Sequence, residues 1–344
     1  MAAQSRALVN TSAHGERFAI SETAYNCAMP TATSPTAMAR RPRFERASEP
    51  PAFQITDRDA DLILAVGRSR FLTSRHLQAL VAGSADKILR RLSALFHAGY
   101  LDRPRAQLDY YSNTGSAPMV YALSDRGAQL LNARFGATFP DTDWQHKNRS
   151  VGRPFIEHTL AIADTHCALT VATQARPEVQ LIGADTLIAS FPTPPLSADR
   201  AFIWRSQVRR NDVIESISVN PDYVFALRSP VISRRCYLVE CDRGSMPVAR
   251  ATFKRTSIVR KYAGYIEGYN AKLHEQQFGW KAFRILFITN TPERADHMRV
   301  ALQDFTRATN IRQLFYFAHA DALATNDILS LDWIDGNGQP QKLI

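Results

Sequence analysis

The sequence predicts an α+β protein in two folded parts, an N-terminal winged helix-turn-helix followed by an α/β domain with a mixed central sheet. Three capped helices, a two-stranded wing and a closing helix follow one another before residue 137. After residue 152, helical and strand-like segments alternate, which is typical of an α/β layer architecture. The 42 Lys and Arg residues outnumber the 32 Asp and Glu residues and give a net charge of +10, so a polyanionic partner is favoured.

Composition excludes several classes of protein. The chain of 344 residues is long enough for two domains. It has no apolar run of about 18 residues, which a membrane-spanning helix requires, and residues 1–20 lack the apolar stretch of a signal peptide. The four cysteines show no CxxC spacing, so we expect free thiols in a reducing cytoplasm and no zinc finger. We therefore expect a cytoplasmic protein that binds nucleic acid and no membrane.

Changes in composition divide the chain into five segments. Residues 1–52 are rich in Ala, Ser, Thr and Pro and are expected to form a disordered tail. Its basic knot, Arg40-Arg41-Pro42-Arg43, is either solvated or in contact with DNA phosphate. Residues 53–136 form the winged helix, residues 137–152 a polar linker, residues 153–325 the α/β domain and residues 326–344 a C-terminal tail.

Each predicted helix of the winged helix begins after a Ser or Thr that can accept a hydrogen bond from the first helical turn. The helices and their caps are Asp57–Val66 after Thr56, Ser74–Val81 after Thr73, Ala85–His97 after Ser84, and a closing helix after Ser124. Gly99 ends the third helix. Tyr100-Leu101, a charged segment through Tyr110-Tyr111, a turn at residues 112–116 and a strand at Met119–Leu123 follow, and this region is predicted to form a two-stranded wing.

The third helix carries its charge away from its apolar face. At about 100° per residue, five apolar residues fall in one arc, namely Ile88, Leu89, Leu92, Leu95 and Phe96. Lys87, Arg90 and Arg91 lie outside that arc, and residues 61–110 have a net charge of +4. We predict that this helix enters a DNA major groove, and that binding uses Arg75, Lys87, Arg90, Arg91, Arg103 and Arg105. The alternatives are a basic face that is merely solvated and a winged helix that contacts proteins.

The second domain is predicted to open with a helix over about Arg153–Ala172. Further strands are expected at Val179–Gly183, Ala201–Val208, the two halves of residues 220–244, Phe283–Ile288 and Leu314–Phe317, with helices at Thr256–Tyr269 and Pro292–Phe305. This order indicates an α/β sandwich around a mixed sheet. Residues 200–284 carry a net charge of +9, so the second domain has a basic surface of its own.

Three acids end two neighbouring strands in this domain. Asp222 follows Pro221 at the start of one strand, and Glu240 and Asp242 end the next. Residues two apart on a strand point to the same face, so Glu240 and Asp242 are expected to project together. Carboxylate oxygens are the ligands that Mg²⁺ prefers. The alternative is that these acids simply end their strands in solvent.

These motifs resemble the PD-(D/E)xK nuclease superfamily, in which Pro-Asp and a later Glu bind Mg²⁺ and a Lys helps to activate water. The winged helix, the Pro221-Asp222 pair, the block from Val239 to Gly244 and the helix with Lys261-Tyr262-Ala263-Gly264-Tyr265 together resemble the replication-relaxation family. The resemblance covers roughly residues 55–320, and the family is similar to MobC-type relaxases. It implies a restriction-endonuclease-like domain and a role in the replication or mobilisation of plasmids and integrative elements. It also implies nicking of double-stranded DNA at an origin-like site, with Mg²⁺ or Mn²⁺ as cofactor.

Carried over by position, the resemblance assigns a catalytic set of Asp222, Glu240, Asp242 and Lys261. Asp222 and Glu240 become metal ligands, and Asp242 a third ligand or the group that orients a metal-bound water. The superfamily's Lys position holds Asp242 here, so Lys261, or else Lys254, is expected to supply the cation. Glu157, on the first helix of this domain, is a candidate outer acid.

Other interpretations stay open at this point. Tyr262 or Tyr265 is either a nucleophile or a core residue, and His158 and His166 are interpreted as core or surface histidines. The departure at Asp242 favours a non-catalytic DNA-binding regulator with an inactive nuclease fold. Expected partners besides DNA are a second copy of the chain or proteins of a mobilisation complex.

Overall fold

The computed structural model describes residues 42–50, 52–108, 117–136, 139, 143–210 and 213–344. The chain divides into a unit of residues 1–43, of which only the last two are described, and a compact unit of residues 44–344. The disordered tail predicted for residues 1–52 therefore lies mostly outside the described residues, and its basic knot does so in part. Among the described helices, none has the length and apolarity needed to cross a membrane.

The N-terminal helices begin where their caps predicted. The elements are α1 (Asp57–Ser69), β1 (Phe71–Thr73), α2 (Ser74–Leu80), α3 (Ala85–His97), β2 (Leu101–Asp102), the short 3-10 helix η1 (Arg105–Gln107), β3 (Val120–Leu123) and α4 (Asp125–Phe135). The side chains of Thr56, Thr73 and Ser124 each accept a hydrogen bond from the first turn, whereas Ser84 makes no such bond. The strands form one antiparallel sheet in the order β1-β3-β2, so β1 adds a third strand to the two expected.

The core of this part lies between α1, α2, α3 and the small sheet. It contains Leu62, Ile63, Val66, Leu77, Ile88, Leu92, Leu95, Phe96, Leu101 and Leu123, all buried. Leu89 was expected on the same apolar arc, but 42% of it is exposed, because it lies at the edge of the buried face.

A buried ion pair joins α1 to α3. Asp59 is fully buried, and Arg91 donates from Nε to its Oδ1 at 2.8 Å and from a second nitrogen to its Oδ2. Asp59 also accepts from the backbone N–H of Thr56 at 2.8 Å. Burial raises the pKa of Asp59, but the hydrogen bonds from Arg91 and Thr56 outweigh burial and leave this pKa below its ordinary value. Arg91 therefore holds two helices together.

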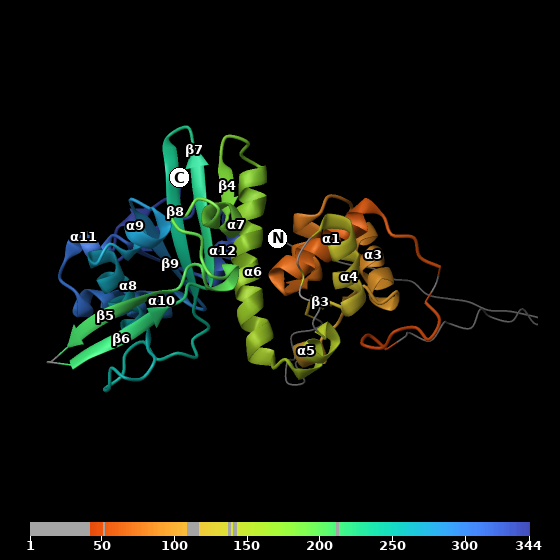
Figure 1. Cartoon of the computed structure of the whole chain (residues 1–344), viewed down its shortest axis with the longest axis horizontal. Helices are drawn as coiled ribbons and strands as arrows, with labels where there is room; N and C mark the ends of the chain where they lie inside the picture. The colour runs from red at the N-terminus through yellow and green to blue at the C-terminus, as the bar shows by residue number, and fades with distance from the viewer. Residues whose placement is uncertain (1–41, 51, 109–116, 137–138, 140–142, 211–212) are drawn as a thin grey trace, which may run out of the picture. The chain divides into compact units, whose positions relative to one another are not determined.

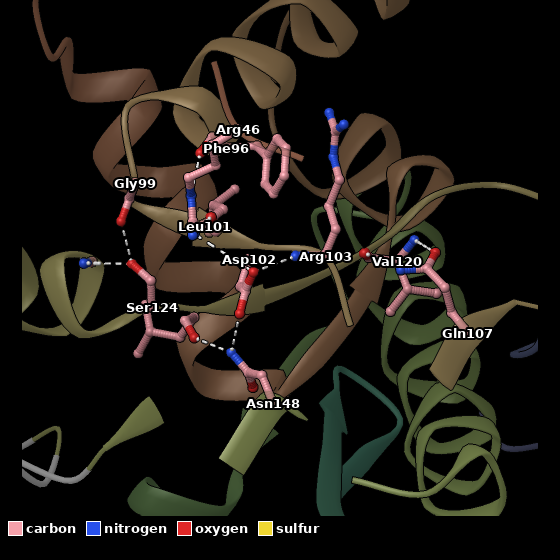
Figure 2. Close-up of polar contacts among 12 residues, drawn as sticks. Arg46, Phe96, Gly99, Leu101, Asp102, Arg103, Gln107, Val120, Ser124 and Asn148 are labelled. Carbon is pink, nitrogen blue, oxygen red and sulfur yellow. Dashed lines mark hydrogen bonds and ion pairs between the residues drawn. The ribbon is translucent and has the colours of Figure 1, made fainter. Parts of the chain in front are cut away.

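Two segments predicted to be unstructured are anchored in the fold. Figure 2 shows Arg46, from the expected tail, donating to the carbonyl oxygens of Phe96 and Leu101 at 2.9 and 3.0 Å. The expected linker, residues 137–152, contains α5 (Trp144–Ser150), whose buried Asn148 donates to the carbonyl of Leu123 at 2.8 Å. Both segments were missed for the same reason. Each is held by a polar side chain that donates hydrogen bonds to backbone carbonyls, and such a contact leaves no hydrophobic periodicity in the sequence.

The second part is built on a seven-stranded mixed sheet in the order β12-β11-β10-β9-β8-β7-β4. The strands are β4 (Gln180–Gly183), β7 (Tyr223–Ser229), β8 (Ile232–Cys241), β9 (Phe283–Thr289), β10 (Phe315–His319), β11 (Trp333–Asp335) and β12 (Pro340–Gln341). β8, β9 and β10 run parallel, and the other neighbours pair antiparallel. The mixed sheet agrees with the predicted α/β layers.

Helices cover both faces of this sheet, as Figure 1 shows for α6 on one side and α8 on the other. The helices of this part are α6 (Arg153–Gln174), α7 (Ala184–Ile188), η2 (Ala198–Arg200), α8 (Ile258–Asn270), α9 (Leu273–Phe278), α10 (Pro292–Phe305), α11 (Thr309–Arg312) and α12 (Ala320–Thr325). Tyr262 and Met298, from α8 and α10, pack with Phe287 on one face, and Leu169 of α6 packs with Tyr237 on the other.

A separate two-stranded ribbon packs on α8. It consists of β5 (Trp204–Arg210) and β6 (Val213–Val219), which pair antiparallel. The strand predicted at 201–208 is therefore not part of the main sheet, and β6 was not predicted. A side chain at Gly264 or Gly268 would strike Val219 or Trp204 within 2.7 Å, so two glycines one turn apart allow helix and ribbon to approach closely.

The predicted C-terminal tail instead completes the sheet. β11 and β12 lie within residues 326–344, and Trp333 and Leu343 are fully buried there. Tyr237 of the central strand donates to the carbonyl of Leu343 at 2.7 Å. The strands were overlooked because they are only three and two residues long.

Replacing Arg91 by Met is expected to lower the free energy of unfolding by roughly 3 kcal/mol, because it leaves Asp59 buried without its cation. Arg90 carries the same charge on the neighbouring, exposed position. Arg90→Met should therefore change the free energy of unfolding by less than about 0.5 kcal/mol. Urea unfolding followed by circular dichroism measures both. Equal effects of the two substitutions would contradict the structural role of Arg91.

Candidate functional site

Two acidic side chains meet at one edge of the seven-stranded sheet. Asp222 stands directly before β7, and Glu240 is the last but one residue of β8. The antiparallel pairing of Tyr223 with Val239 brings them to the same edge. Asp222 Oδ2 then accepts from the backbone N–H of Cys241 at 2.8 Å, which fixes its position. We call Asp222 and Glu240 the acid pair; the structure brings these two predicted residues together.

Glu240 is held out of water by partners from α8. Its side chain is 2% exposed. Lys261 forms an ion pair with its Oε2, and the hydroxyl of Tyr265 donates to its Oε1 at 2.5 Å. Lys261 and Tyr265 are four residues apart and therefore share one face of the helix. Lys261, from the helix after the strand, thus contacts one of the two predicted acids.

The charged groups of this cluster shift one another's pKa values. Burial raises the pKa of Glu240 from 4.5 to about 7; the nearby Asp222 carboxylate adds to the rise and Lys261 opposes it. Burial lowers the pKa of Lys261, but the charges of Glu240 and Asp222 outweigh burial and leave that pKa above its ordinary value. Lys261 therefore stays protonated at neutral pH, while Glu240 titrates near it.

His158 of α6 completes the surroundings of the acid pair. Its Nε2 lies 3.2 Å from Asp222 Oδ1. The hydrogen bond to Asp222 raises the pKa of His158, with burial opposing the shift. The sequence assigns His158 only to the core or the surface, because a single histidine near the start of a helix carries no spacing signal. The contact depends on how α6 packs on the sheet, 64 residues from Asp222 in the chain.

Asp242 faces the same helical layer as Glu240 but has other partners. Arg294 of α10 binds both of its oxygens, and the hydroxyl of Thr289 donates to Oδ2 at 2.9 Å. Its side chain is 5% exposed. The alternation along the strand was predicted, whereas the partner from α10 was not. Asp242 is therefore occupied by an arginine that lies 52 residues away in sequence.

Other predicted candidates are also engaged elsewhere. Glu157, the expected outer acid, forms ion pairs with Arg243 and Arg153. Tyr262 and Tyr265 are fully buried, and burial raises both of their pKa values well above 10.0. A buried neutral phenol is a poor nucleophile, so the geometry favours structural roles for both tyrosines. Lys254 is exposed on the segment between β8 and α8.

The acid pair offers only two carboxylates to a metal ion. Within the part of the chain that the structure describes, no group of three or more His, Cys, Asp or Glu residues could hold a metal ion. Asp242, bound to Arg294, does not add a third ligand. Mg²⁺, however, is commonly held by one or two carboxylates, with water and substrate phosphates as its remaining ligands. Two carboxylates would therefore suit only a metal whose other ligands are water and substrate, and they do not make a closed protein site.

The predicted DNA-binding residues fall into two groups. Arg75, Lys87 and Arg90 are exposed on α2 and α3, and the side chain of Arg105 is 72% exposed. Arg91 belongs to the buried ion pair with Asp59. Arg103 stacks on the ring of Phe96 at 4.1 Å. Four of the six candidates are therefore exposed, and two make contacts within the fold.

Comparison with known proteins gives one finding. Residues 64–280 match the model of the replication-relaxation family. The matched segment begins in α1, ends beyond α9 and contains Asp222, Glu240 and Lys261. Searches of curated proteins and of solved structures found no match.

Removing the Lys261 ammonium is expected to make stability more sensitive to pH. The pKa of folded Glu240 already exceeds its unfolded value of 4.5, so the stability that this group contributes is lost as pH rises through about 7. Without Lys261 that pKa rises further. In Lys261→Met the free energy of unfolding should therefore fall more steeply between pH 5 and 9, with a limit of about 1.4 kcal/mol per pH unit for one proton.

Urea unfolding at several pH values measures this slope. In Lys261→Met/Glu240→Gln the titrating group is gone, so the added slope should vanish. If the double variant keeps the slope of Lys261→Met, Glu240 is not the group responsible.

Proposed function

This chain belongs to the replication-relaxation family, and we propose that it is a DNA-binding protein of plasmid or integrative-element replication and mobilisation that nicks DNA at the acid pair. The observation that carries the proposal is the convergence of Asp222, Glu240 and Lys261 from two strands and the following helix. These are two carboxylates and a cation, the groups used for metal-assisted attack on a phosphate. The substrate is double-stranded DNA at an origin-like site.

We assign a role in DNA binding to the N-terminal part. Its helices and three-stranded sheet have the element order of a winged helix-turn-helix, and α3 presents Lys87 and Arg90 on its exposed side. Such a helix fits a major groove. We assign a restriction-endonuclease-like fold, similar to that of MobC-type relaxases, to the second part. The support is the order of its elements and the strand-end position of its acids.

In the proposed reaction Asp222 and Glu240 would hold Mg²⁺ or Mn²⁺, and the metal would supply Lewis-acid activation of water and of the phosphate. The chain's own residues prepare this site. The Cys241 N–H and His158 fix both oxygens of Asp222, and the Tyr265 hydroxyl orients Glu240. The Lys261 ammonium stabilises the negative charge that develops on the phosphate during attack.

A second function is favoured by a specific observation. Glu240 is almost fully buried and already neutralised by Lys261, and Asp242 is neutralised by Arg294. Acids that are satisfied within the fold are also expected of a DNA-binding regulator that has lost catalysis. This alternative keeps DNA binding and predicts no cleavage under any metal.

Nicking of supercoiled plasmid separates the two functions. A plasmid carrying the element's own origin is incubated with the protein and Mg²⁺ or Mn²⁺, and relaxed product is followed on gels. Asp222→Asn and Glu240→Gln should each lower the rate at least about 100-fold, because each removes a charged ligand. Asp242→Asn, which weakens the ion pair with Arg294, should keep metal-dependent nicking. Intact DNA binding without relaxed product in the wild type would favour the regulator.

Replacing Lys87 and Arg90 together by Ala should weaken binding to duplex DNA. The slope of log K against log salt should fall by roughly 0.9 for each phosphate that is no longer neutralised, hence by about 1.8. Fluorescence anisotropy at several salt concentrations measures this slope. Arg228→Ala/Arg234→Ala removes two exposed charges from the β7–β8 end and serves as the matched control. Equal slopes in both double variants would rule out α3 as the DNA-binding element.

A further inference from the structure

The ribbon of β5 and β6 carries a basic outer face. Along β5, Arg205, Gln207 and Arg209 are exposed, whereas Trp204, Ser206 and Val208 are buried against α8. Opposite them on β6 stand the exposed Ile214, Ser216 and Ser218. Among the described outward residues of the ribbon there is no acid.

The segment between β8 and α8 adds charge next to the ribbon. Lys254 and Arg255 are exposed on it. Arg260 of α8 binds the Glu215 carboxylate of β6 at 2.5 Å and donates to the carbonyl of Phe253 at 2.8 Å. One arginine thus ties this segment and the ribbon to the same helix. We call Arg205, Arg209, Lys254 and Arg255 the ribbon surface.

The ribbon surface is connected to the acid pair through α8. Arg260, which holds the ribbon, is followed directly by Lys261, which binds Glu240. Figure 1 shows the ribbon beside α8, away from the β7–β8 turn. A strand rises about 3.3 Å per residue, so the backbones at Arg205 and Arg209 lie roughly 13 Å apart. Two arginines on backbone positions this far apart can meet separate anionic groups of an extended polyanion.

We propose that the ribbon surface is a second DNA-binding surface, which binds backbone phosphates of the duplex beside the acid pair. Arg is suited to this role because its planar guanidinium can bind a phosphate through two hydrogen bonds. Contacts to phosphate carry no sequence information and fix the position of the duplex. The ribbon surface therefore positions DNA, and base recognition is left to α3. This inference rests on the proposed DNA-processing function and assigns it a further interface.

The test compares two variants of the full chain in binding to a duplex that lacks the origin. Arg205→Ala/Arg209→Ala/Lys254→Ala/Arg255→Ala should lower the salt slope by roughly 0.9 per phosphate, up to about 3.6. Its affinity at 0.15 M salt, taken as about physiological, should fall at least tenfold. Arg228→Ala/Arg234→Ala, at the β7–β8 end, should keep the wild-type slope. Affinity and slope equal to those of this control would overturn the proposal.

Two further variants keep the test decisive. Arg205→Lys/Arg209→Lys keeps the charge and should keep the slope, and Arg205→Ala/Arg209→Ala alone should lower the slope by about 1.8 if the fourfold variant folds poorly. Binding to vesicles with anionic lipid is measured in parallel. Loss of vesicle binding with unchanged DNA binding would make this a membrane surface and would overturn the proposal.

The outcome is separable from that of the nicking experiment. A wild type that binds DNA through the ribbon surface but never nicks would uphold this interface and reject catalysis. Metal-dependent nicking that persists in the fourfold variant with unchanged DNA affinity would uphold catalysis and reject the interface.

Discussion

A carboxylate held out of water is the constraint on which the second part of this protein depends. Glu240 lies on the central strand β8, where burial disfavours its charge. An ammonium and a hydroxyl from α8 compensate it, so the helix must pack with Lys261 and Tyr265 facing the sheet. A buried pair of this kind adds little net stability, but removal of either partner is strongly destabilising. Residues serving this pair are therefore constrained by both fold and chemistry.

An adjoining face of α8 is constrained by space. Gly264 and Gly268 face β5 and β6 so closely that a methyl group would clash. Ser206 of β5 donates to the carbonyl of Gly264 at 2.8 Å, an added hydrogen bond that only close approach permits. One helix therefore presents side chains to the acid pair and bare backbone to the ribbon. The Lys, Tyr and Gly residues between positions 261 and 268 meet these two requirements, contact with the acid pair and close approach to the ribbon.

Local patterns in the sequence predicted local structure well. Thr56, Thr73 and Ser124 begin helices because a cap and its first turn are adjacent in sequence. Strand alternation likewise predicted that Glu240 and Asp242 face one layer. The partners of these acids could not be predicted in the same way. Arg294 reaches Asp242 only after a parallel crossover through β9, and periodicity says nothing about which helix arrives there.

Predictions from helical angles also cannot identify partners that lie on another element. They placed Arg91 outside the apolar arc of α3, which is correct, and so it was counted with the cations available to DNA. Its partner Asp59 is on α1, 32 residues earlier, so the angles of α3 alone could not reveal the pair. Charge patterns identify which residues are polar, and only packing decides which of them are already neutralised.

Arg260 and Lys261 give α8 a property that neither residue has alone. They are consecutive, and one holds the ribbon while the other holds Glu240. A helical turn is rigid, so a displacement that withdraws one side chain also displaces the other. If ligands bound at both ends and one changed the affinity of the other, the second would change the affinity of the first by the same factor. The contacts to the ribbon and to the acid pair are therefore made by residues that are neighbours in the sequence.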